Sequence, residues 1–73
     1  MRGNFLYKRI GERIVSARKN RGISQETLAL VSEIDRTYLA RIEQGNVNPS
    51  IKVLHKISRH LHISMSILLR GIG

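Results

Sequence analysis

Apolar residues in the first part of the chain recur at the three- and four-residue spacing of a helix. The inward face of a helix over residues 6–20 is formed by Leu6, Ile10, Ile14 and Ala17. Gly22 follows as a stop, because glycine readily takes the left-handed conformation that ends many helices. The chain therefore opens with one amphipathic helix.

Two short helices are expected next, each preceded by a residue type that caps helix N-termini. Ser24 caps a helix that ends near Ser32. Asp35 caps the following helix, which ends before Gly45. The expected inward residues are Leu28, Ala29 and Val31 in the first of these helices, and Leu39 and Ile42 in the second. A turn over residues 32–34 joins them, so residues 24–44 form a helix-turn-helix.

The last third of the chain continues the helical spacing. Pro49 and Ser50 open a helix whose inward residues are Val53, Leu54, Ile57 and Leu61. Ser64 caps a final short helix, about residues 64–70, that carries Met65, Ile67, Leu68 and Leu69 and ends at Gly71. With no alternating strand pattern, the expected fold is all-α, a compact bundle of about five helices in a single domain over residues 1–73.

The charge balance points to a polyanionic partner. Thirteen Lys and Arg residues oppose five Asp and Glu residues, giving a net charge of +8. Such an excess favours a partner that is nucleic acid or an anionic membrane surface. On charge alone, the alternative is a solvated basic face that only keeps the protein soluble. A membrane-active protein would need a continuous cationic amphipathic helix, and Gly22, Gly45 and Pro49 interrupt the chain. Nucleic acid is therefore the favoured partner, and no membrane partner is expected.

A cytoplasmic location is expected from the apolar segments and the residue types. The first residues lack the apolar run of a signal peptide, and the run Ile67–Leu69 is too short to span a bilayer. Cysteine is absent, which fits a reducing compartment and removes disulfides as a source of stability. A chain this short commonly gains stability from a partner subunit instead.

The run SQETLALVSEIDRTYLARIEQGNVNPS, residues 24–50, resembles the DNA-binding domains of the Cro and phage-repressor helix-turn-helix family. The resemblance covers about residues 6–69 and implies a lambda-repressor-like fold and a sequence-specific transcription regulator. Within that family, the chain is similar to the controller proteins of restriction-modification systems, which are small dimers that activate or repress their own operon. A small phage or plasmid repressor, and an antitoxin-like or RNA-binding module, remain the alternatives.

Base readout is expected from the second helix of the motif, whose N-terminal part enters the major groove in such proteins. Arg36, Thr37 and Arg41 lie on the face opposite Leu39 and Ile42, so they point outward together. Arginine can bind guanine through two hydrogen bonds, and the threonine methyl group can contact thymine. The expected partner is a palindromic double-stranded operator that contains guanines.

Phosphate contacts are expected around these base-reading residues. Gln25 resembles the family's glutamine at the start of its helix, where the helix N-terminus itself attracts anions. Further candidates are Tyr38, Asn46, Asn48, Ser50 and Lys52, which follow in the recognition helix, the next loop and the next helix. Tyr38 could equally be packed, and Asn48 could serve only to shape the turn before Pro49.

Two further features follow from the resemblance. In the family, an arginine at the position of Arg18 pairs with a glutamate at the position of Glu43, so the resemblance implies a structural ion pair between these two residues. The family commonly has glycine where this chain has Glu33, so the turn either differs or is strained. Glu33 and Glu26 would also form an acidic patch of the kind that some relatives use to contact RNA polymerase, unless they are simply solvated surface, which is the more common role of such residues.

The apolar residues of the last helix predict a homodimer. They exceed what so short an element can bury on one domain, and a symmetric dimer would place two recognition helices about 34 Å apart, on successive major grooves. The expected contacts are Met65, Ile67 and Leu68, unless these residues simply complete the core of one subunit.

Neither a cofactor nor an enzymatic activity is expected. His55, His60 and His62 do not have the spacing of a tetrahedral metal site, and no cysteine is present to complete one. No glycine-framed nucleophile or phosphate-binding loop accompanies the serine and histidine residues.

Overall fold

The computed structural model describes residues 3–71 and shows five helices and no strand within that range. They are α1 (Gly3–Asn20), α2 (Gln25–Val31), α3 (Arg36–Gln44), α4 (Ile51–Leu61) and α5 (Met65–Leu69). The all-helical bundle expected from the periodicity is confirmed, although α1 begins earlier than residue 6. No helix in this range is both long enough and apolar enough to cross a bilayer.

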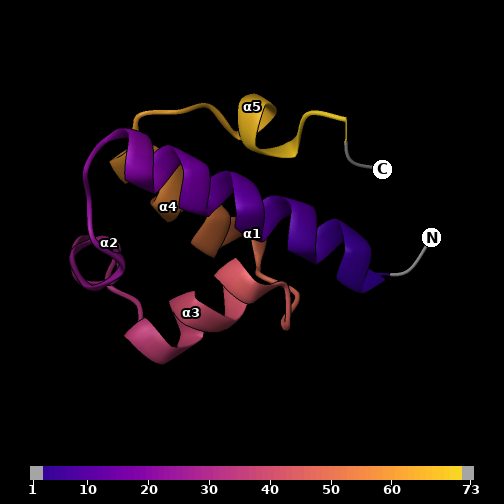
Figure 1. Cartoon of the computed structure of the whole chain (residues 1–73), viewed down its shortest axis with the longest axis horizontal. Coiled ribbons are helices and arrows are strands. Elements are labelled where there is room, and N and C mark those ends of the chain that lie inside the picture. The colour runs from indigo at the N-terminus through magenta and orange to yellow at the C-terminus, as the bar shows by residue number, and fades with distance from the viewer. Residues whose placement is uncertain (1–2, 72–73) are drawn as a thin grey trace.

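The first helix organises the rest of the bundle. With 18 residues, α1 is about 27 Å long at a rise of about 1.5 Å per residue. It therefore spans most of the longest dimension of the molecule, 32 Å. Figure 1 shows α3 and α5 on opposite sides of α1, with α4 crossing behind it and α2 at the end where α1 stops. Contacts join α1 to α3, α4 and α5.

One apolar core lies where these helices meet. The buried apolar side chains are Ile10, Ile14, Leu28, Ala29, Leu39, Ile42, Leu54, Ile57, Leu61 and Leu68. Most of the residues expected to face inward are among them. Val31 is an exception, since 42% of its surface is exposed and the expectation that it faces the core was wrong. The inward face of α2 runs instead through Leu28, Ala29 and the C-cap residue Ser32, which is 1% exposed, and Val31 lies outside it.

The predicted capping residues lie at the starts and ends of the helices. The hydroxyl groups of Ser24, Ser50 and Ser64 each accept a hydrogen bond from the backbone three residues later. Asp35 occupies the N-cap position of α3 but makes no side-chain capping bond. At the other end of α3, Gly45 has a φ of 78°, the left-handed conformation expected of a glycine stop.

Candidate nucleic-acid interface

The expected base-reading residues lie together on the outer face of α3. Arg36, Thr37 and Arg41 are exposed, while Leu39 and Ile42 on the opposite face are buried. The buried face holds α3 against the core and leaves the first turns of the helix open to solvent. This is the geometry in which a helix can enter a major groove.

A tight turn sets the angle between α2 and α3. Glu33 has a φ of 58°, so it occupies the left-handed region in which the family commonly has glycine. The turn is closed by hydrogen bonds from the backbone N–H of Glu33 to the Leu30 carbonyl at 3.1 Å and from that of Ile34 to the Ala29 carbonyl at 3.0 Å. The turn thus keeps its shape with a side chain where glycine would be unstrained, at a cost of about 1–2 kcal/mol.

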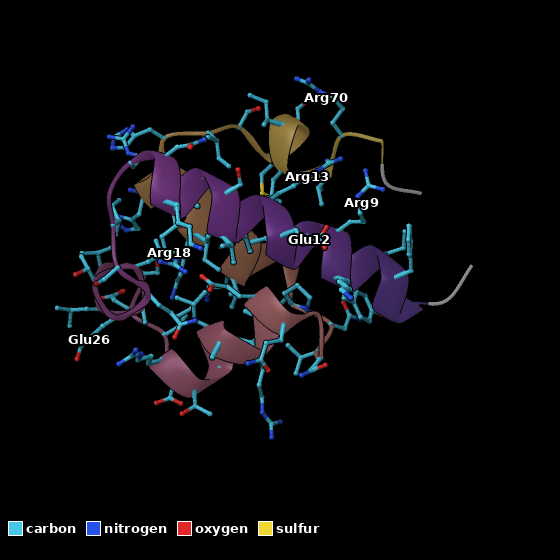
Figure 2. The ribbon with its side chains drawn as sticks, viewed as in Figure 1. Arg9, Glu12, Arg13, Arg18, Glu26 and Arg70 are labelled. Carbon is cyan, nitrogen blue, oxygen red and sulfur yellow. The ribbon has the colours of Figure 1, made fainter. Side chains whose placement is uncertain are left out.

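An ion pair joins α1 to α3 beneath the recognition surface. Arg18 donates through Nε to Glu43 Oε2 at 2.9 Å and through a terminal nitrogen to Oε1 at 3.1 Å. The two side chains are only 13% and 5% exposed. A third bond, from Arg18 to the Ile23 carbonyl at 3.1 Å, also ties the loop before α2 to α1. The structure therefore contains the pair that the resemblance implied, and Figure 2 shows Arg18 pointing from α1 toward α2 and α3.

The same carboxylate begins a chain of hydrogen bonds that ends on Arg36, one of the residues expected to read bases. The Gln25 amide nitrogen donates to Glu43 Oε1 at 2.9 Å, and Gln25 Oε1 accepts from Arg36 Nε at 3.3 Å. Sequence reasoning assigned Gln25 only to phosphate. It did not anticipate that one amide would link the ion pair to Arg36, because that contact depends on how α2 and α3 cross.

The other phosphate candidates follow one another along the segment from α3 to α4. Asn46, Asn48, Ser50 and Lys52 are all exposed. Asn46 donates to the Gln44 side chain at 3.0 Å, so its amide is already oriented in the free protein. Tyr38 is half-buried and packs against the core, which leaves only part of its side chain for a partner.

Two glycines allow α1 and the end of α3 to meet backbone to backbone. A Cβ atom on Gly11 would lie 2.4 Å from the Glu43 carbonyl oxygen, and one on Gly45 would lie 2.6 Å from the Lys8 Cα atom. Sequence reasoning used Gly45 only as a helix stop and gave Gly11 no role. The available signal was a glycine directly beside the inward-facing Ile10, in the middle of a long helix.

The sequence profile of the helix-turn-helix family matches residues 14–68. The chain belongs to the helix-turn-helix family. This membership identifies it as a DNA-binding transcription regulator and confirms the resemblance to phage-repressor proteins seen in the sequence.

Individual relatives of this helix-turn-helix protein include regulators of two kinds. The control protein C.MunI of a Mycoplasma species is 40% identical over 70 residues, covering 94% of this chain and 95% of that protein. The immunity repressor of Bacillus phage phi105 is 39% identical over 57 residues, 78% of this chain but only 40% of the repressor. The crystal structure of the restriction-modification controller C.AhdI from Aeromonas hydrophila matches with a TM-score of 0.82 and 35% identity, over 85% of this chain and 94% of that one.

The last helix of this helix-turn-helix protein is more deeply packed than the sequence suggested. Leu68 is fully buried in the core of the single chain, so its assignment to a dimer surface was wrong. Met65 is half-buried and packs against the same core. Ile67 is 47% exposed and remains available to a partner. Arg13 holds this helix to α1 by donating to the carbonyl oxygens of Leu68, at 3.3 Å, and Arg70.

The histidines of this helix-turn-helix protein do not assemble into a metal site. Within residues 3–71, no three His, Asp or Glu side chains come together in a group that could hold an ion. His62 instead ends α4, with a φ of 57° in the left-handed region. The proteins matched above are DNA-binding regulators rather than enzymes.

Proposed function

We propose that this chain is a transcription regulator that binds a palindromic operator as a homodimer, and that it controls a restriction-modification operon. The observation that supports this most directly is the outer face of α3. Three exposed side chains with base-reading chemistry, Arg36, Thr37 and Arg41, share that face. They stand above a buried ion pair that fixes the position of the helix.

The hydrogen bond from Arg36 to Gln25 suits guanine recognition. It uses the Nε atom of Arg36, so both terminal nitrogens of the guanidinium remain free. Two parallel donors match the O6 and N7 atoms of guanine in the major groove, a contact that contributes about 1–3 kcal/mol of discrimination. Arg41 can make the same contact without such support, since it is exposed five residues further along α3.

The backbone contacts that would place α3 come from the residues around it. Gln25 has a second amide N–H that can donate to a phosphate while the first stays on Glu43. The remaining phosphate contacts in this proposal are Asn46, Asn48, Ser50, Lys52 and the Tyr38 hydroxyl group. Such contacts set the register of the protein on the duplex but carry no sequence information.

In this proposal, the dimer contact is formed by the exposed Ile67 together with the solvent-accessible part of the half-buried Met65. A symmetric contact through α5, on the side of α1 away from α3, leaves both recognition helices free to meet one face of the duplex (Figure 1). Two helices spaced by about 34 Å would enter successive major grooves, which requires a palindromic site.

The controller function is favoured because C.MunI matches this chain over 95% of that protein's length. A second candidate, a phage or plasmid repressor, is favoured by the match to the phi105 immunity repressor. Both functions require operator binding, and they differ in the gene that is controlled.

A contact of Glu26 and Glu33 with RNA polymerase at the promoter would add transcription activation to either function. Both side chains are exposed beside Leu30, which is 76% exposed.

Selection of bound sequences from random duplex DNA at physiological salt tests this proposal. We expect the wild-type protein to enrich a palindrome with guanines in each half-site. Arg36→Ala and Arg41→Ala should each lose the preference at a defined base pair, by about 5- to 150-fold for a contact of 1–3 kcal/mol. Arg59→Ala, an exposed arginine in the last turn of α4, is the matched control and should select the wild-type palindrome.

Failure of the selection has a defined meaning. Binding that enriches no sequence and merely weakens with salt would leave only the non-specific electrostatic attraction and overturn operator recognition. Preferential binding of single-stranded or structured RNA in a competition experiment would favour the RNA-binding use of the same fold.

A further inference from the structure

Lys8 lies directly against the end of the recognition helix. A Cβ atom on Gly45 would fall 2.6 Å from the Cα atom and 2.9 Å from the Cβ atom of Lys8, so the two backbones are as close as a glycine allows. Lys8 itself is exposed. Across this contact, Gly45 is followed in the chain by Asn46, which begins the loop to which several phosphate contacts are assigned.

The residue next to Lys8 points another way. The Arg9 guanidinium lies over the ring of Phe5, 5.9 Å from its centre. Figure 2 shows Arg9 on the side of α1 where Arg13 and α5 lie, away from α3. The first turns of α1 therefore carry two adjacent positive charges, of which only Lys8 borders the recognition helix.

We propose that Lys8 binds a DNA phosphate at the edge of the half-site, which extends the interface onto the first helix. This inference rests on the proposed operator binding. A recognition helix that enters the groove by its N-terminal part leaves its C-terminal end near the groove rim, where the phosphates lie. Lys8 borders that end, and the strongly hydrated lysine charge on its flexible stem suits a phosphate better than a base edge.

The slope of operator affinity against salt concentration tests this contact. Each neutralised phosphate contributes about 0.9 to the slope of log affinity against log salt. We expect Lys8→Gln to lower that slope by about 0.9 for each protomer on the selected duplex, and to weaken operator and scrambled duplexes alike. Arg9→Gln removes the same charge from the same turn and should leave the slope at the wild-type value. Lys8→Arg should retain the wild-type slope.

A purely structural role for Lys8 gives a different result. A positive charge beside the C-terminus of α3 also favours the helix dipole, so Lys8→Gln is expected to lower the melting temperature slightly. If Lys8→Gln changes only the melting temperature, or if Lys8→Gln and Arg9→Gln change the slope equally, the phosphate contact is overturned. If the wild-type protein does not distinguish the selected duplex from its scrambled form, the proposed operator binding itself fails.

Discussion

The two sides of α1 hold their partner helices by different means. On one side, α3 is held by a nearly buried ion pair and by two glycines that bring backbones into contact. On the other side, α5 is held by the apolar Leu68 and by Arg13, whose guanidinium binds carbonyl groups. Both sides combine buried apolar side chains with hydrogen bonds, but the charged pair below α3 is nearly buried, whereas the hydrogen bonds of Arg13 at α5 are partly or fully exposed. Substitutions below α3 should disturb folding and DNA binding together.

The largest effect is expected from breaking the ion pair on the α3 side. Glu43→Ala leaves the Arg18 charge nearly buried without its partner, which should lower the free energy of unfolding by about 3–5 kcal/mol in urea denaturation. The matched control is Glu12→Ala, which removes an exposed carboxylate from α1 and should cost at most about 0.5 kcal/mol. A loss below about 1 kcal/mol for Glu43→Ala would show that the α3 side is held mainly by burial.

The close backbone contact on the α3 side gives the next largest effect. Gly11→Ala should lower the free energy of unfolding by about 3 kcal/mol despite alanine's better helix propensity, because its methyl group would collide with backbone atoms of α3. Gly22→Ala is the control, since a Cβ there meets nothing within 4 Å and only the positive φ is strained, at about 1–2 kcal/mol. Equal losses for the two variants in thermal unfolding would mean that α1 can shift away from α3 at little cost.

The contrast between the two sides also marks how far the sequence could predict the molecule. Capping residues and helical spacing were enough to predict the five helices and the helix-turn-helix, because both signals depend only on residues close together in the sequence. The pairing of Arg18 with Glu43 came only from family resemblance, since nothing local joins residues so distant in sequence. Periodicity says which face of a helix is apolar, but not how much of it a neighbour covers.

The errors and omissions of the sequence interpretation follow from that limit. Val31 is exposed because Leu28 and Ser32, one helical turn apart, occupy the inward face of α2, and Leu68 is buried because α5 packs against both α1 and α4. The role of Gly11 and the bond from Gln25 to Glu43 depend on how helices cross, which spacing along one helix does not contain.

On the α5 side, the expected effect is on assembly rather than on folding. Ile67→Asn should raise the dimer dissociation constant about tenfold or more in sedimentation experiments, because each protomer loses the burial of the exposed half of an isoleucine, roughly 0.7–1.5 kcal/mol. Monomer unfolding should change little, since Ile67 is already 47% exposed. Ile51→Asn replaces another isoleucine, 67% exposed at the start of α4, and should leave the dissociation constant unchanged. Unchanged assembly of Ile67→Asn would remove α5 as the dimer contact.

The smallest effects concern backbone strain, which both sides contain. Glu33, before α3, and His62, before α5, have φ values of 58° and 57°. Glu33→Gly and His62→Gly should each raise the free energy of unfolding by about 0.5–1 kcal/mol, because relief of strain exceeds the added entropy of glycine in the unfolded chain. Glu33→Ala keeps the strain while removing the charge and should bring no such gain. Similar gains at both positions would show that the strain is local and independent of how each helix is held, whereas a gain at His62 alone would mean that the turn before α3 is stabilised by contacts of the Glu33 side chain.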